Sequence, residues 1–325
     1  MLLSLLQQFD IALSDFLFIL GSVGLGLFFA LCGLCLPLGA LAAEVFYVGS
    51  RKAVYDKCAL QTAQTAFASG LFICLLLSLC LALARALLPP EATLPSLLSR
   101  PELPLFPPLV FLCLLGLYLY TWTPLKKIRA LHLLLGLVAA LSGPLLLFCA
   151  LLLLGGMQQP EVVDLLFEAP LEILQSLVED FLRLPHQWGM FAFLLFTGLA
   201  SGFALNQLWL FARRAKADYG RDYYAFALRR LARCASGFTL AAAAMGASIF
   251  YRLYTATPAD FRQPPDPGVL VVAFGLPLVS CLLWFLIIKS DTPMRHKAGA
   301  LFGCLFLFVA LCAQLAALVS TFPRL

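Results

Sequence analysis

Long runs of apolar residues alternate with short polar loops along most of the chain. About 20 consecutive apolar residues are needed for a helix to cross the hydrocarbon core of a bilayer. Backbone groups in lipid must be satisfied within the segment, so we expect helices rather than strands. The pattern predicts an all-α integral membrane protein with about eight transmembrane helices, at 17–45, 60–88, 106–123, 129–154, 187–211, 235–254, 268–288 and 298–320.

Lys and Arg gather in every second connection between these runs. Of the 22 basic residues, 16 lie in four segments, at 46–59, 124–129, 212–234 and 289–297. Short loops rich in Lys and Arg stay on the cytoplasmic side of a membrane. We therefore expect both the N-terminus and the C-terminus to lie outside.

The segment 159–186 differs from the basic loops because it carries acidic residues at helical spacing. Apolar residues fill the side opposite to these acids, as is typical of an amphipathic helix lying in the outer interface. The acidic side is either a solvated face or a docking surface for a basic partner. The acids are Glu161, Asp164, Glu168, Glu172 and Glu179.

This interfacial segment also divides the chain. It separates a first four-helix group, 1–158, from a second, 187–325. No sequence repeat relates the two groups.

The composition excludes an ordinary soluble domain. Apolar residues make up 62% of the chain and charged residues 12%, whereas soluble domains carry roughly 25% charged residues. The net charge of +5 does not indicate nucleic-acid binding, because the positive charge lies in short loops. The N-terminus shows no basic region and no cleavage site of a signal peptide, so we expect the first span to act as the insertion signal.

The 11 cysteines lie mostly inside the apolar runs, where cysteine acts as a small hydrophobic residue. Cys32 and Cys35 have CxxC spacing, but they lack the second Cys or His pair that zinc sites use. We expect no metal site at these cysteines.

Glu44 is the plainest ionisable residue inside a predicted span, near its inner end. Ionisable residues in spans are costly, and they mark candidate functional positions. Glu44 is either a structural carboxylate, within reach of Arg51 or Lys52 in the next loop, or an acid on a proton pathway or beside a cofactor.

Histidine is scarce, with His132, His186 and His296 only. Haem buried between helices takes His or Met as axial ligands. His186 opens the fifth span on the outer side, too far across the bilayer from His132 to share a haem with it. Met190, one turn later, and Met245 on the sixth span are candidate partners of His186. The alternative is that His186 is a hydrogen-bonding residue at the interface.

Two further groups of polar residues lie near the inner ends of spans. Such groups commonly link helices by hydrogen bonds, and the alternative is a hydrated proton path. One group shares a face of the second span, and the other lies in the fifth: Gln61, Thr62, Thr65 and Ser69, then Asn206 and Gln207. The chain contains no nucleotide-binding loop and no HExxH motif, so nothing indicates a hydrolase or a nucleotide-driven transporter.

Two stretches resemble subunit I of the cytochrome bd quinol oxidases. The first is 44-EVFYVGSRKAVYDKCA-59, where the family has a Glu, a Tyr-containing turn, a basic pair and a Tyr before the second helix. The second begins at Trp122 and ends 155-GGMQQP-160, close to the family's Gly-Trp-Met-Gln-Asn-Pro. The resemblance covers roughly 15–255 and is consistent with an outward N-terminus.

The departures from this family concern its haem ligands. The family carries a haem-ligating His in its first helix, but no His occurs in 1–131 here. Its third helix carries acidic residues, and 106–122 has none. Its long quinol-binding loop corresponds here to the short segment 252–267. The resemblance therefore implies that the oxygen-reducing haem pair is lost, with one haem b at His186 left as a candidate.

The resemblance implies a haem-poor or haem-free scaffold or electron-transfer subunit of a respiratory redox complex, in a prokaryotic cytoplasmic membrane. Its partners would be other membrane and redox subunits, with quinone at a helix interface and a c-type cytochrome outside. Any enzymatic role would belong to a quinol-linked oxidoreductase complex rather than to a complete oxidase. The alternative is a transporter or channel that uses the helix bundle as a solute path, because Gly and Pro in the spans allow broken helices.

Overall fold

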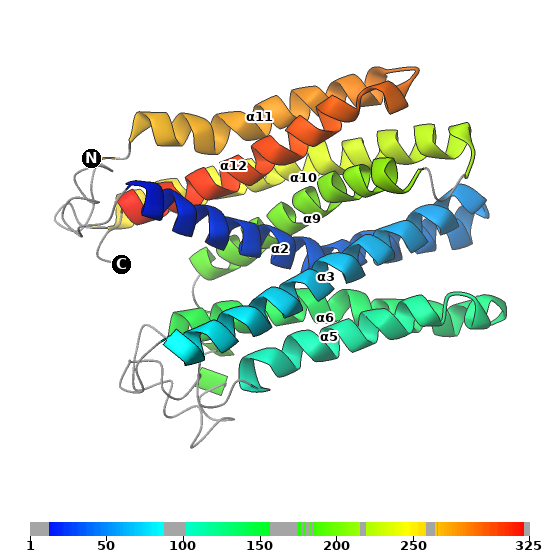
Figure 1. Cartoon of the computed structure of the whole chain (residues 1–325), viewed down its shortest axis with the longest axis horizontal. Helices are drawn as coiled ribbons and strands as arrows, with labels where there is room; N and C mark the ends of the chain where they lie inside the picture. The colour runs from blue at the N-terminus through cyan, green and yellow to red at the C-terminus, as the bar shows by residue number, and fades with distance from the viewer. Residues whose placement is uncertain are drawn as a thin grey trace. The chain divides into compact units, whose positions relative to one another are not determined.

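The computed structural model describes residues 13–87, 102–156, 175–176, 178–179, 183, 185–214, 219–257, 264 and 266–321. Within these residues the chain forms eight long α-helices and two short 3₁₀ turns (Figure 1). The helices are α2 (Leu13–Ser50), α3 (Ala53–Leu87), α5 (Glu102–Tyr120), α6 (Arg129–Gly156), α9 (Pro185–Arg213), α10 (Arg221–Ala256), α11 (Pro267–Lys289) and α12 (Lys297–Thr321). The turns are η1 (Pro124–Lys127) and η3 (Pro293–Arg295).

Seven of these helices are long and apolar enough to cross a membrane. The apolar part of the eighth, Leu105–Tyr120 in α5, is shorter. The described chain is thus an all-helical, multi-pass membrane protein, as the sequence predicts. The orientation of its termini stays a prediction.

Several helices extend beyond the predicted spans into polar sequence. The clearest case is α10, which begins at Arg221 although the predicted span begins at 235. A hydropathy window detects only segments whose mean composition suits lipid. The first turns of α10 carry charges, which lower the mean hydropathy, although one of their faces is buried through Tyr223, Tyr224 and Ala227. Amphipathic turns of this kind continue a helix past its purely apolar part.

The chain divides into two compact units. One is Gly33–Ala192, and the other combines Met1–Cys32 with Phe193–Leu325. Helix α2 contributes residues to both units. The predicted interfacial segment 159–186 lies almost entirely outside the described residues.

In the unit Gly33–Ala192, glycines allow the backbones of neighbouring helices to approach closely. A Cβ atom on Gly143 of α6 would lie 1.9 Å from the carbonyl oxygen of Leu34 in α2. A Cβ on Gly33 of α2 would lie 2.9 Å from the backbone nitrogen of Gly70 in α3. Small residues at such crossings let transmembrane helices pack by van der Waals contact. Helix α2 is therefore packed tightly against both α3 and α6.

The reversal between α2 and α3 is short. α2 ends at Ser50 and α3 begins at Ala53. Arg51 adopts the left-handed conformation with φ 58°, which is uncommon for residues other than glycine and turns the chain sharply. The last turns of α2 and the first turns of α3 thus lie at the same level of the unit.

In the other unit, the described polar contacts mainly support helix ends. The guanidinium of Arg229 in α10 donates to the carbonyl of Ser290 through Nε (3.2 Å) and Nη2 (2.8 Å), at the end of α11. The Asp266 side chain accepts from the backbone N–H groups of Gly268 and Val269 and caps the start of α11. These contacts satisfy backbone groups that helix ends leave without partners.

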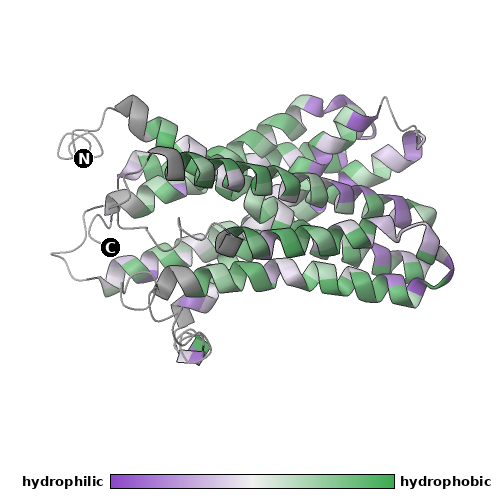
Figure 2. Cartoon of the chain, turned by 60° about the horizontal axis from the view of Figure 1, so that its bottom comes forward, coloured by the Kyte–Doolittle hydropathy of each residue, from purple (hydrophilic) through white to green (hydrophobic). Residues whose placement is uncertain are grey.

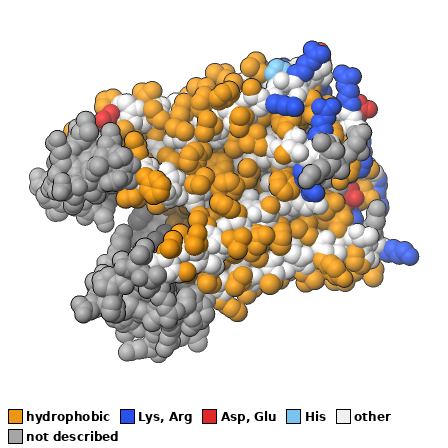
Figure 3. All heavy atoms as spheres, viewed as in Figure 1, with side chains coloured by type: hydrophobic (Ala, Val, Ile, Leu, Met, Phe, Trp, Pro, Cys, Tyr) orange, Lys and Arg blue, Asp and Glu red, His pale blue; other side chains and the backbone are white. Residues whose placement is uncertain are grey.

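Hydrophobic residues extend along the helices, and hydrophilic residues lie toward their ends (Figure 2). The space-filling view shows the same distribution, with Lys and Arg side chains at helix ends (Figure 3). Large apolar side chains on the helix faces are exposed, among them Val271 (71%) and Leu282 (66%) of α11. An exposed apolar face of this length suits contact with lipid rather than with water.

Candidate functional site

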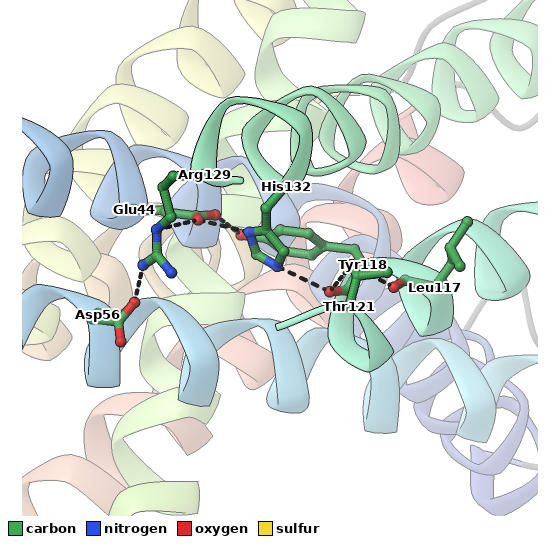
Figure 4. A network of polar contacts seen from close by, with 7 residues as sticks. All are labelled: Glu44, Asp56, Leu117, Tyr118, Thr121, Arg129 and His132. Carbon is green, nitrogen blue, oxygen red and sulfur yellow. Dashed lines mark hydrogen bonds and ion pairs between the residues drawn. The ribbon is translucent and has the colours of Figure 1, made fainter. Parts of the chain in front are cut away.

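The side chain of Glu44 is completely buried near the end of α2. Its charged partners come from α6 and not from the adjacent loop, where Arg51 and Lys52 are exposed. The local pairing considered from the sequence is therefore replaced by contacts across the bundle. Figure 4 shows the network around this carboxylate.

Three side chains contact the Glu44 carboxylate. The Tyr118 hydroxyl of α5 donates to Oε2 at 2.6 Å. Nδ1 of His132 in α6 lies 2.7 Å from Oε1. Nε of Arg129, one turn earlier in α6, lies 3.4 Å from the same Oε1. Nε of Arg129 has no hydrogen-bond partner among the described residues, so its contact with Glu44 is an ion pair and not a hydrogen bond.

Arg129 links the buried carboxylate to Asp56 of α3, because Nη2 of its guanidinium donates to Asp56 Oδ1. Both side chains are partly exposed, Arg129 by 17% and Asp56 by 18%. The Tyr47 ring of α2 lies against the guanidinium, with Cζ 4.6 Å from the ring centroid. The network thus runs from a partly exposed ion pair to a fully buried carboxylate.

His132 is also completely buried, and both of its ring nitrogens face an oxygen atom. Nε2 lies 3.2 Å from the backbone carbonyl oxygen of Tyr118, which also accepts from the Thr121 hydroxyl at 3.1 Å. The Tyr118 and Trp122 rings enclose the imidazole, each with its centroid 4.8 Å from that of the imidazole. These contacts fix the orientation of the ring and keep it away from water.

The sequence around the turn between α5 and α6 builds this enclosure. Arg129 and His132 are three residues apart in the first turns of α6, so they share one helix face. Gly136 follows His132 by one turn, and a Cβ there would lie 2.8 Å from Cε2 of Tyr118. Glycine at 136 therefore leaves the space that the Tyr118 ring occupies.

The residues predicted to hold haem are described only in part. The backbone of His186 belongs to α9, and its side chain lies outside the described residues. Met190 belongs to the unit Gly33–Ala192 and Met245 to the other unit, and both are half-buried. In the described part of the chain, no three His, Cys, Asp or Glu side chains form a group that could hold a metal ion. The haem and the quinone remain predictions.

Most of the predicted acidic docking surface lies outside the described residues, namely Glu161, Asp164, Glu168 and Glu172. Glu179 is described and half-exposed. Its carboxylate accepts from Gln175 Nε2 at 3.2 Å and from Arg183 Nη2 at 3.5 Å, within one helical turn on each side. Docking of a basic partner also stays a prediction.

The polar face of α3 is buried, and three of its hydroxyls bond within their own helix. The hydroxyls of Thr62, Thr65 and Ser69 donate to the carbonyls four residues earlier, at 2.7, 3.0 and 3.0 Å. In α9, Gln207 is fully buried, and neither atom of its amide group has a hydrogen-bond partner in the described part of the chain.

Four residues of the network could not be placed beside Glu44 from the sequence alone: Asp56, Tyr118, Arg129 and His132. A signal for them was available in the topology. All four lie at helix ends joined by basic loops, which the positive-inside rule assigns to the same side of the membrane as Glu44. Charged side chains at the same depth of a small helix bundle are expected to form ion pairs, because an unpaired charge inside the membrane is costly.

The network brings two carboxylates, one guanidinium and one imidazole together. Asp56 and Arg129 form one ion pair, and Glu44 and His132 form a second acid–base pair beside it.

No protein-family model matches the chain, and no curated protein matches it either.

Proposed function

We propose that this membrane protein is a scaffold subunit of a redox complex, and that the Glu44 network holds the fold of its Gly33–Ala192 unit. The observation that carries the proposal is the full burial of Glu44, with Tyr118 on one of its carboxylate oxygens and His132 on the other. A carboxylate engaged in this way by the protein itself suits a structural role better than binding of a solute.

The cost of burying the network supports this assignment. The cost of removing charges from water is offset in a low-dielectric interior only when the charges are paired and hydrogen-bonded. A protein in which hydrophobic side chains replace such charges is often as stable. In some proteins such a network is retained for the specific arrangement it imposes, and we infer the same role here. Here it joins four helices, α2, α3, α5 and α6. A subunit that must present fixed helix faces to its neighbours needs such a constraint.

The finer identity rests on the resemblance to subunit I of the cytochrome bd quinol oxidases. In this proposal the chain is a haem-poor relative in a prokaryotic cytoplasmic membrane, beside subunits that carry the cofactors. One haem b at His186, quinone at a helix interface and a c-type cytochrome at the acidic outer segment are the corresponding expectations.

Purification of the full-length chain from its native membrane, through a tag on the chromosomal copy, tests the proposal. The expected result is a stoichiometric assembly with cofactor-bearing membrane subunits, identified by mass spectrometry and by visible spectra. A chain that purifies alone in a single monodisperse form would contradict the scaffold role. A pyridine haemochrome assay on His186→Ala, with His296→Ala as the matched control, tests the predicted haem b separately.

A second candidate function, a solute path, is favoured by one observation. On α9, the side chains of Thr197, Ser201 and Gln207 are buried and have no hydrogen-bond partner among the described residues. Polar groups of this kind can line a hydrated route. Flux into liposomes that hold the purified chain, lost in Gln207→Leu and kept in Gln64→Leu, would favour this function over the scaffold.

A further inference from the structure

We infer that Glu44 and His132 share one exchangeable proton, which makes this pair a proton-binding site inside the bundle. The inference rests on the hydrogen-bond geometry of the pair and does not depend on the redox assignment.

Nε2 of His132 faces a group that can only accept a hydrogen bond. A backbone carbonyl oxygen has lone pairs and no hydrogen, so it can only accept a hydrogen bond. Nε2 lies 3.2 Å from the carbonyl oxygen of Tyr118 in a buried, enclosed position. Nε2 therefore carries a hydrogen, because two facing lone pairs at this distance would repel and leave both atoms without a partner.

The opposite ring nitrogen, Nδ1, faces the Glu44 carboxylate. Nδ1 lies 2.7 Å from Oε1 of Glu44, a distance that requires one hydrogen between the two atoms. With Nε2 already protonated, this hydrogen makes either an imidazolium beside a carboxylate or a neutral imidazole beside a carboxylic acid. In both forms the Tyr118 hydroxyl donates to Oε2 at 2.6 Å, so every polar atom of the pair keeps its partner.

Transfer of the proton between the two forms needs no movement of heavy atoms. The proton leaves Nδ1, whose lone pair remains on the ring, and binds Oε1. The positive charge of the imidazolium and the negative charge of the carboxylate vanish together. The pair is neutral before and after the transfer.

The charged and titratable groups around the pair preserve this balance. Asp56 faces it from α3, Arg129 from α6, Tyr118 from α5 and Tyr47 from α2. Asp56 and Arg129 cancel each other, while Arg129 alone attracts the carboxylate form of Glu44 at 3.4 Å. Loss of the shared proton would leave a net negative charge. It would also leave either Nδ1 bare against the carboxylate or, if the remaining hydrogen moved to Nδ1, Nε2 bare against the Tyr118 carbonyl. The site therefore retains one proton.

The test uses full-length protein in lipid nanodiscs with ¹⁵N-labelled histidine. Heavy-atom positions do not show which ring nitrogen carries a hydrogen, and nitrogen NMR distinguishes the two states directly. We expect His132 to show a protonated Nε2 and an Nδ1 signal intermediate between the two states, which changes after transfer into D₂O. His132→Asn identifies the signal against those of His186 and His296. A bare Nε2 with a protonated Nδ1, or no change in D₂O, would overturn the inference.

Glu44→Gln provides a second measurement that does not require the loss of the histidine. The glutamine amide can donate to Nδ1 while its oxygen accepts from Tyr118, so the packing is kept. We expect the His132 Nδ1 signal to become that of a bare nitrogen, and an infrared band of a buried carboxylic acid to disappear. An unchanged imidazolium signal with no such band in the parent protein would show a fixed ion pair and overturn the sharing. His296→Asn is the control that leaves both readouts unchanged.

Discussion

The two units of the chain satisfy their buried polar groups in different ways. In Gly33–Ala192, acidic and basic side chains on three helices pair with each other around Glu44, and a tyrosine hydroxyl on a fourth donates to it. In the other unit, Arg229 and Asp266 serve helix ends, while several buried hydroxyl and amide groups have no partner among the described residues. The latter group comprises Thr197, Ser201, Gln207, Ser236, Thr239 and Thr321.

This difference indicates which side chains hold each unit together. Breaking a buried charge pair is expensive, because the charge that remains has no water to solvate it. Removing a buried polar group that had no partner costs little, since its desolvation penalty disappears with it. Substitutions at equally buried polar positions of the two units are therefore expected to have opposite consequences.

Glu44→Ala is expected to have the largest effect, a loss of about 3–5 kcal/mol in the free energy of unfolding. The substitution removes the carboxylate that accepts from the Tyr118 hydroxyl, contacts His132 and forms an ion pair with Arg129. Denaturation in mixed micelles, followed by tryptophan fluorescence, measures the loss. Glu179→Ala, at a half-exposed position, is the matched control and should change stability little. Equal effects at the two positions would contradict a structural role of the network.

Tyr118→Phe removes one hydrogen bond to a charged group and keeps the ring. We expect a loss of about 1.5–3 kcal/mol, smaller than for Glu44→Ala, because only the Oε2 partner is lost. The same unfolding assay measures it. In the combined variant Glu44→Ala/Tyr118→Phe, the second change should cost much less than it does alone, since the two groups act on one contact. Simple additivity would exclude their coupling.

Gly143→Ala tests the close approach of α6 to α2. The added Cβ would lie 1.9 Å from the Leu34 carbonyl oxygen, so the backbones must separate. Overpacking of this kind costs about 1–3 kcal/mol. Gly237→Ala is the control in the other unit, where nothing lies within 4 Å of the new Cβ. It should stabilise the helix slightly, by up to about 1 kcal/mol. If Gly143→Ala were also stabilising, the helix crossing would have to be wider than described.

Gln207→Met should have the smallest effect and the opposite sign to Glu44→Ala. Gln207 is buried without a partner for its amide group in the described part of the chain, so an apolar side chain of similar length is expected to be neutral or to stabilise by up to about 1 kcal/mol. Thermal unfolding in detergent detects the change. A loss larger than about 1 kcal/mol would mean that water or another subunit satisfies Gln207, and the contrast between the units would then weaken.

Hydropathy alone predicted the helical class and the apolar core of each span, because lipid imposes composition and length directly. It placed the ends less well. The predicted span 235–254 misses the first part of α10, which begins at Arg221 in sequence that suits the interface rather than lipid. Tyr223 and Tyr224 are buried by neighbouring helices. The hydropathy of the local sequence does not reflect contacts with other helices, so it could not predict this burial.

The site was predicted only at its centre. Glu44 is visible in the sequence because a carboxylate in an apolar run is costly. Its partners are 74 to 88 residues away, and their identity depends on which face of α5 and α6 points inward. Tyr118 and Tyr120 look alike in the sequence, yet Tyr118 is buried and Tyr120 is 78% exposed. Only the packing of the helices distinguishes them.

The balance of charges around Glu44 has an electrical consequence. A transmembrane voltage of 100 mV does work of about 2.3 kcal/mol on each unit charge that crosses the whole membrane. A net charge inside the membrane at Glu44 would therefore be subject to a force from this voltage. Asp56 cancels Arg129, and the proposed shared proton keeps the Glu44–His132 pair neutral. The voltage therefore exerts no net force on this cluster and can bias only where the proton sits along the short line between Nδ1 and Oε1.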